Sequence, residues 1–96
     1  MIELPPELLS YKRTPTFTED TVPAGLLRDH STKEGMWGLI RVEEKRLLYV
    51  ITDPRHPATE SILTVTDQPG AVEPAVLHRV ESQGSVRFHV EFYRSP

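Results

Sequence analysis

Four histidines are the residues of this sequence best suited to chemistry, because an imidazole can bind a metal, transfer a proton or form a buried hydrogen bond. His56 lies between two prolines in PRHPATE, a segment typical of an exposed loop, and we set it aside. His30 and His78 are far apart, and no local spacing such as HxxxH links them. They can form one site only if the fold brings distant strands together.

The stretch VEPAVLHRVE, residues 72–81, places His78 among valines and a leucine that are typical of a buried strand. Glu73 and Glu81 lie in the same stretch, so a metal or ligand site is one interpretation. The other is a structural histidine that satisfies a backbone carbonyl. The residues alone leave both interpretations open.

Other polar and aromatic residues could complete such a site. Glu91 shares one face of the alternating run VRFHVEFY with His89, although an ion pair with Arg41 or Arg87 would also explain it. Trp37 follows the loop STKEG and would either wall a pocket or belong to the core. The pocket residues that we expect are Glu34, Trp37, His89 and Glu91.

The composition restricts the class of protein. With 96 residues and 10.9 kDa, the chain can supply the core of one domain, residues 1–96. The net charge is −3 and the basic residues are scattered, which argues against nucleic-acid binding. Cysteine is absent, so a metal would need His, Asp or Glu ligands. We find no signal peptide and no apolar run of membrane-spanning length, so we expect a cytoplasmic protein without membrane contact.

The pattern of residues predicts an all-β fold. Nine prolines and five glycines separate short apolar runs, and the run 86–93 alternates strictly. We expect residues 1–23 to form an N-terminal arm and residues 24–30 to form a strand that ends at His30. The runs 36–44 and 46–53 have the spacing of a hairpin around Glu44 and Lys45. About seven or eight strands of this kind are typical of an antiparallel sandwich or barrel.

Three segments, TVPAGLLRDHSTKEGMWGLIRV, PGAVEPAVLHRVE and FHVEFY, resemble the small cupins called TehB/YeaR-like, which are associated with tellurite resistance. The resemblance runs from about residue 11 to 93. It implies a cupin double-stranded β-helix, a jelly-roll barrel over residues 24–93. His30 matches the first cupin motif and His78 the second, but Thr32 replaces a motif histidine and only Glu34 could serve as its glutamate.

The resemblance leads to the hypothesis of a cytoplasmic cupin that binds a divalent metal at the barrel mouth. His30, His78 and a carboxylate, with Glu81 preferred over Glu91 or Glu34, would hold Zn²⁺, Fe²⁺, Ni²⁺ or Mn²⁺. The ligand would be a small molecule or an oxyanion, bound in a tellurite or other stress response.

Two alternatives remain beside the metal-binding cupin: a metal-dependent oxygenase or isomerase, and a metal-free binding or assembly module that forms a homodimer. TehB proteins proper are methyltransferases. We do not extend methyl transfer to this chain, because it has no glycine-rich nucleotide loop that opens a helix.

Overall fold

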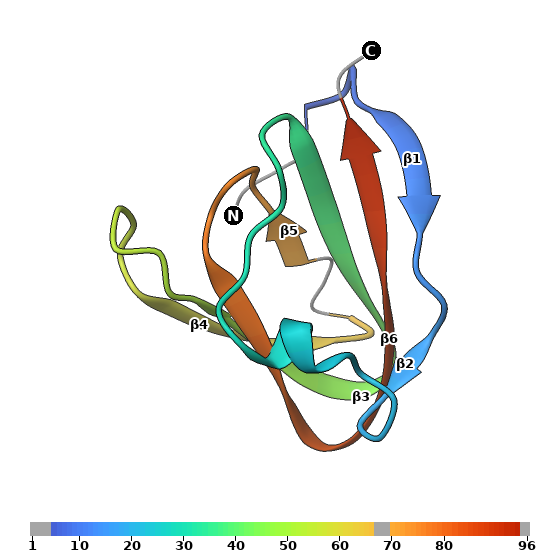
Figure 1. Ribbon diagram of the computed structural model, residues 1–96. Helices are drawn as coiled ribbons and strands as arrows, with labels where there is room; N and C mark the ends of the chain where they lie inside the picture. Colours follow the sequence, from blue (N-terminus) through green and yellow to red (C-terminus); the bar gives the residue numbers. More distant parts are fainter. Residues whose placement is uncertain (1–4, 67–69, 95–96) are drawn as a thin grey trace.

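The computed structural model describes residues 5–66 and 70–94, and in this part of the chain every regular element but one is a strand. The exception is a single short 3-10 helix, so the all-β class is confirmed (Figure 1). No helix in the described residues is long and apolar enough to cross a membrane. The elements are β1 (Leu9–Arg13), β2 (Phe17–Thr18), η1 (Ala24–Leu27), β3 (Met36–Ile51), β4 (Thr59–Thr64), β5 (Gly70–Val72) and β6 (His78–Arg94).

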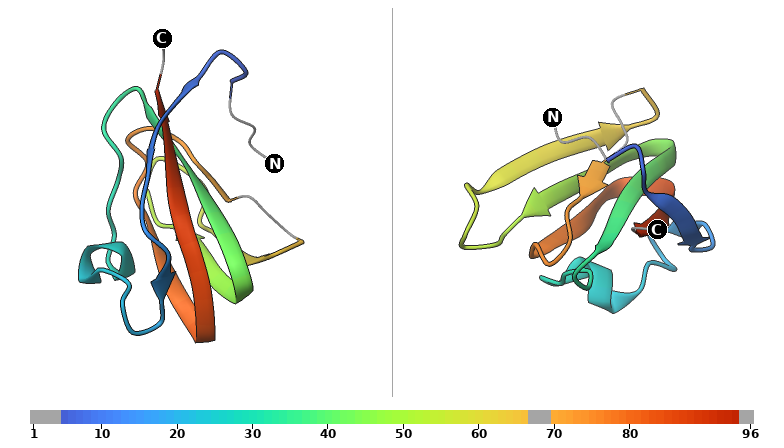
Figure 2. Two further views of the ribbon diagram at one scale, coloured as in Figure 1. Left: turned by 90° about the vertical axis from the view of Figure 1, so that its right-hand side faces the viewer. Right: turned by 90° about the horizontal axis from the view of Figure 1, so that it is seen from above.

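The sheet is built on two long antiparallel strands, β3 and β6, which pair along most of their length. β1 and β2 pair with the other edge of β6, while β4 and β5 pair with the other edge of β3. The strand order β1-β6-β3-β4 ends in two different edge strands, so the sheet stays open (Figure 2). The cupin jelly-roll barrel that we expected is therefore not confirmed.

The hairpin predicted around Glu44 and Lys45 is wrong, because β3 continues through both residues. The polar segment ESQGS likewise lies within β6. The pairing of the two strands shifts register on either side of Lys45, whose φ is 66°, and Gly84 on β6 has a φ of 88°. Such β-bulges bend a strand without ending it, and both strands bend sharply in this region (Figure 2).

The strand predicted over residues 24–30 is also wrong. Pro23 precedes η1, and the backbone N–H of Leu26 donates a hydrogen bond to the carbonyl of Pro23 at 2.9 Å. Val22 and Leu26 then pack against the core from outside the sheet. Only His30 makes a strand-like pair, a bridge with His78. The segment before β3 consequently lies over one face of the sheet instead of extending it.

The apolar face predicted for residues 86–93 is confirmed, because Val86, Phe88 and Val90 are buried, although His89 on the other face is buried as well. Val86 and Phe88 are each 1% exposed, whereas Arg87 between them is exposed. Phe88 meets the ring of Phe17 edge to face, with 5.7 Å between the ring centroids. The arm segment thus contributes β2 and an aromatic side chain to the same side of the sheet.

Gly84 offers a test of the bend. Its φ of 88° suits glycine, so Gly84→Ala should destabilise the protein by about 1–2 kcal/mol. Gly25→Ala is the matched control, because nothing lies within 4 Å of an added Cβ there and no positive φ is required. That control should leave stability unchanged or raise it by a few tenths up to about 1 kcal/mol. Urea denaturation measures both, and equal effects would contradict the role of Gly84 in the bend.

Candidate functional site

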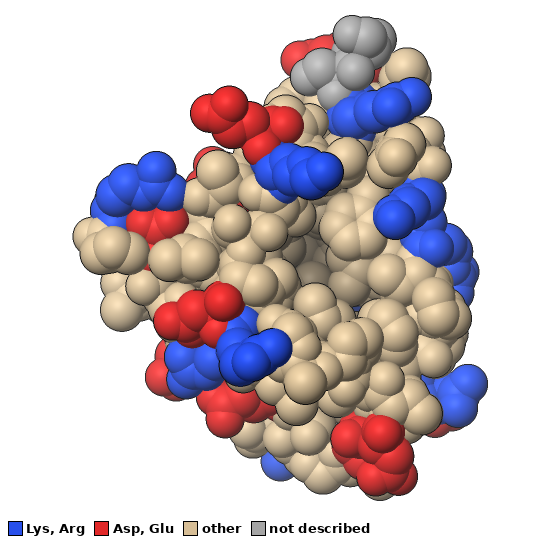
Figure 3. All heavy atoms as spheres, viewed as in Figure 1, with Lys and Arg blue, Asp and Glu red and all other residues tan. Residues whose placement is uncertain are grey.

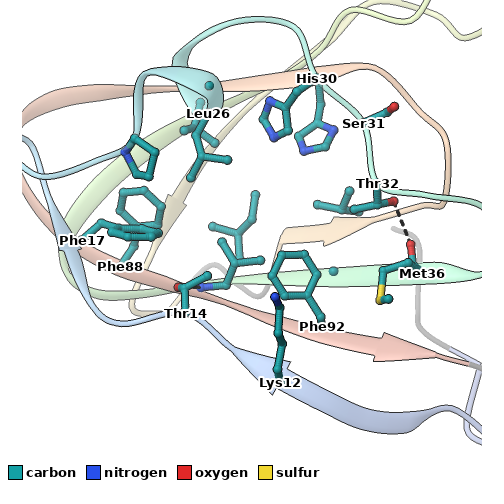
Figure 4. A pocket seen from close by; sticks show the side chains of 18 of the residues that line it. Lys12, Thr14, Phe17, Leu26, His30, Ser31, Thr32, Met36, Phe88 and Phe92 are labelled. Atoms are coloured by element: carbon teal, nitrogen blue, oxygen red, sulfur yellow. Dashed lines mark hydrogen bonds between the residues drawn. The ribbon is translucent and has the colours of Figure 1, made fainter.

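A cavity of about 480 Å³ lies between the sheet and the segment that carries η1. It appears in the surface view as a hollow surrounded mostly by residues other than Lys, Arg, Asp and Glu (Figure 3). Its walls are mainly apolar, and the aromatic and aliphatic side chains come from both layers (Figure 4). Those that Figure 4 labels are Phe17, Leu26, Met36, Phe88 and Phe92. The volume lies within the range of about 300–1,000 Å³ that is usual for small-molecule sites.

His30 and His78 lie side by side on the cavity wall. Their backbones exchange two hydrogen bonds of 2.9 Å, and their ring centroids are 4.1 Å apart. Tyr49 meets the other side of the His78 ring edge to face, with 5.7 Å between centroids. The fold therefore brings together two histidines that are separated by 47 intervening positions, from 31 to 77.

Each imidazole of the pair is oriented by a backbone carbonyl two residues earlier. The Nδ1 atom of His30 is 2.9 Å from the oxygen of Arg28, and Nδ1 of His78 is 2.9 Å from the oxygen of Val76. A carbonyl oxygen only accepts, so Nδ1 must carry the proton in both rings. In the neutral form, Nε2 of each ring is then a hydrogen-bond acceptor.

Burial favours the neutral form of His78. Its side chain is 4% exposed, and this desolvation lowers its pKa below the usual histidine value. The hydrogen bond to Val76 acts in the opposite direction, while the neighbouring His30 lowers the pKa further. Burial also raises the pKa of Tyr49 to about 12, so its hydroxyl stays protonated and donates to the carbonyl of Ala71 at 3.0 Å.

Asp53 holds the turn that leads into His78. Its carboxylate accepts hydrogen bonds from the backbone of Leu77 at 3.0 Å and from the guanidinium of Arg55 at 2.7 and 2.9 Å. Arg55 also donates to the carbonyl of Ala75, whose φ is 61°. Hydrogen bonds from Arg55 and Leu77 keep the pKa of Asp53 well below its usual range. Asp53 is thus a positioning residue for the histidine pair.

Glu81 does not join the two histidines. On β6, His78 and Val80 line the cavity, and successive side chains of a strand point to opposite faces. Glu81 consequently lies on the face of Arg79, with which it forms an ion pair at 3.2 Å. The described residues contain no group of three or more His, Asp or Glu side chains that could hold a metal.

The four predicted pocket residues, Glu34, Trp37, His89 and Glu91, are not among those that line the cavity. His89 is buried, with Nδ1 2.7 Å from Glu43 and Nε2 3.1 Å from Glu91. Glu91 also accepts hydrogen bonds from Arg41 and Tyr93. These residues form a polar network on the side of β6 that faces away from Phe88, Val90 and Phe92.

Comparison with known proteins identifies the family. The model of the TehB-like domain matches residues 12–90 of the chain. The chain belongs to the TehB-like domain family. The fold agrees, because the crystal structure of TehB from Haemophilus influenzae superposes with a TM-score of 0.85 and 30% identity over 94% of this chain and 32% of that one. A solved protein from E. coli strain K12 is 21% identical and shares the fold over 100% and 99% of the two chains, with a TM-score of 0.88.

Two curated relatives carry an activity in their names. Both are called probable S-adenosyl-L-methionine-dependent methyltransferase TehB, from two strains of H. influenzae, and are 36% and 35% identical to this TehB-like domain over 77 residues. The match covers 79% of the domain but only 27% of each relative. The TehB-like domain therefore spans about a quarter of the length of the curated relatives it matches.

These findings correct the function and cofactor predicted from the sequence. The TehB-like part of the resemblance is confirmed, whereas the cupin part is not supported. A metal-binding cupin is contradicted because the relatives are named S-adenosyl-L-methionine-dependent methyltransferases and the described residues hold no cluster of metal ligands. The metal-dependent oxygenase or isomerase and the metal-free assembly module do not match these names either.

Sequence reasoning missed the apolar wall and Asp53. The alternation of Phe88, Val90 and Phe92 was visible and could have indicated one apolar side of a cavity. The contribution of Leu26 could not be seen, because residues 24–30 look like a strand. Asp53 gave no signal beyond its place before Pro54, since its partner Leu77 lies 24 residues away.

The role of Asp53 can be tested by Asp53→Asn. The amide keeps the shape of the carboxylate but loses the charge that pairs with Arg55 and one of its acceptor oxygens, so the melting temperature should fall clearly. Asp20→Asn, at an exposed position, is the control and should have little effect. A melting temperature unchanged by Asp53→Asn would remove Asp53 as the anchor of the turn before His78.

The polar network on the outer face predicts a loss of stability in acid. Hydrogen bonds from Thr16 and His89 lower the pKa of Glu43. Burial opposes ionisation of Glu91, but hydrogen bonds from Arg41 and His89 outweigh it and lower its pKa. A carboxyl with a lowered folded-state pKa stabilises above its unfolded pKa of about 4.3 and loses this contribution as the pH falls below that value.

The measurement is the free energy of unfolding between about pH 6 and 3. The double variant Glu43→Gln, Glu91→Gln should show a shallower decline than the unchanged protein. Glu60→Gln, on the exposed side of β4, is the control and should keep the original slope. Identical slopes in the double variant and the unchanged protein would contradict the stabilising role of the network.

Proposed function

We propose that this TehB-like domain serves S-adenosyl-L-methionine-dependent methyl transfer by binding the methyl acceptor in its apolar cavity. A separate methyltransferase domain would hold the methyl donor. The observation that carries the proposal is the cavity of about 480 Å³ with paired histidines in its wall. The domain that contains it matches about a quarter of the length of relatives named for methyl transfer.

The residues of the cavity do not fit the methyl donor itself. S-Adenosyl-L-methionine carries a sulfonium and an ammonium cation, and its ribose hydroxyls are hydrogen-bond donors that pair well with a carboxylate. No Asp or Glu is among the residues that line the cavity, while Lys12 and Lys33 are. The described part of the chain also lacks a glycine-rich loop that opens a helix, since its one helix is η1.

An apolar acceptor molecule fits better. Small-molecule sites are usually concave and apolar, with a few polar groups that orient the ligand. Phe17, Phe88 and Phe92 supply apolar area, and the histidine pair supplies polar atoms at one place in the wall. Relatives that join such a cavity to a methyltransferase in one chain would hold the acceptor at high effective concentration near the donor.

The first test separates donor from acceptor binding. Equilibrium dialysis of the chain with radiolabelled S-adenosyl-L-methionine should show no retention, because the cavity lacks carboxylates. Retention that is lost in a Val90→Phe variant, which fills the cavity, would overturn the assignment of the cavity to the acceptor.

The second test uses a chimaera in which this chain replaces the matched segment of H. influenzae TehB. Transfer of radiolabelled methyl groups to small molecules of a metabolite extract should fall at least tenfold in a Val90→Phe chimaera, while donor binding stays intact. Ile62→Phe is the matched control, since Ile62 is exposed on β4, and it should leave transfer unchanged. Equal transfer by both variants would show that the cavity has no part in the reaction.

A further inference from the structure

We propose that the cavity selects uncharged apolar molecules that carry an O–H, S–H or N–H group, and that Nε2 of His30 and His78 accepts the hydrogen bond from that group. The proposal deepens the assigned function by naming the chemical class of the acceptor, and it rests on that function only for the methylation of the ligand. Binding itself can be measured on this chain alone.

The geometry of the two rings supports the acceptor role. Both Nδ1 atoms are committed to donating to the carbonyls of Arg28 and Val76, at 2.9 Å each. Among the described residues, neither Nε2 atom has a hydrogen-bond partner, although both side chains line the cavity. A neutral imidazole nitrogen without a proton accepts from a donor and repels an anion.

Two threonine hydroxyls of the wall are already engaged with the backbone. The hydroxyl of Thr32 donates to the carbonyl of Met36 at 2.8 Å. The hydroxyl of Thr14 donates to the carbonyl of Pro15 and accepts from the backbone of Val90. A ligand buried beside the histidine pair would have to satisfy the two Nε2 atoms, because an unpaired polar group in an apolar site costs binding energy.

Lys12 provides the contrast that makes the proposal specific. Lys12 belongs to β1 and lies across the cavity from His30 (Figure 4). Its ammonium is 5.9 Å from the centroid of the Phe92 ring. Its side chain is exposed at the rim, where solvent and salt weaken its attraction for an anion. A site selected by Lys12 would prefer carboxylates, whereas one selected by the histidine pair prefers uncharged donors.

The experiment compares three probes of similar shape by nuclear magnetic resonance titration of the chain at pH 7.5. Para-cresol carries an uncharged donor, para-methylanisole has that donor capped by a methyl group, and para-toluate is an anion. We expect para-cresol to bind most tightly and para-methylanisole roughly tenfold more weakly, since it leaves Nε2 unpaired. Para-toluate should be weaker than para-cresol.

Variants assign the preference to the histidine pair. His30→Phe keeps a ring in the wall but removes one Nε2 acceptor, so the preference for para-cresol over para-methylanisole should shrink severalfold. His56→Ala is the control, because His56 does not line the cavity, and it should keep that preference. If His30→Phe does not fold, the ¹⁵N shifts of the imidazoles in the unchanged protein decide, because both rings must show the Nδ1–H form and their Nε2 signals must move with para-cresol.

Three results would overturn the proposal: no saturable binding of para-cresol at millimolar concentration, equal affinity for para-cresol and para-methylanisole, or tightest binding of para-toluate. These outcomes are independent of methyl transfer by the chimaera. Selective binding without methylation would overturn only the proposed function, and methylation without this selectivity only the class of acceptor.

Discussion

Two backbone hydrogen bonds between His30 and His78 are the constraint on which the cavity depends. They attach the segment that carries η1 to the first residue of β6, so that Leu26 lies opposite the aromatic residues of the sheet. The same contact sets two imidazoles next to each other with their Nδ1 atoms turned toward carbonyls. This one long-range pairing therefore fixes both the covering of the cavity and the orientation of its polar atoms.

Strand alternation divides β6 into two different surfaces. Phe88, Val90 and Phe92 line the cavity, while His89 and Glu91 face the polar network on the other side. Polar groups removed from water need partners, and Glu43 and Arg41 on β3 supply them across the strand pair. The network stabilises the centre of the sheet without placing a carboxylate in the cavity, which leaves the histidine pair as acceptors in apolar surroundings.

The division of labour that we propose agrees with the size of the domain. The sheet and the segment over it enclose an apolar cavity whose lining, among the described residues, contains no Asp or Glu, so the cationic methyl donor would meet no carboxylate there. The relatives are more than three times longer than the matched segment, with 27% of their length covered. A ligand-binding domain beside a catalytic domain uses each fold for the chemistry it can support.

The sequence by itself determined the all-β class, the TehB-like family and the two faces of residues 86–93. Local patterns were sufficient there, because alternation and motif order are properties of contiguous residues. Only the tertiary structure decided that β3 and β6 bend through bulges, that residues 24–27 form η1, and that Glu81 faces away from His78. Bulges, register and cross-strand partners depend on residues far apart in the chain, which local patterns do not reveal. For this reason the histidine positions suggested a metal site where the structure has an apolar cavity.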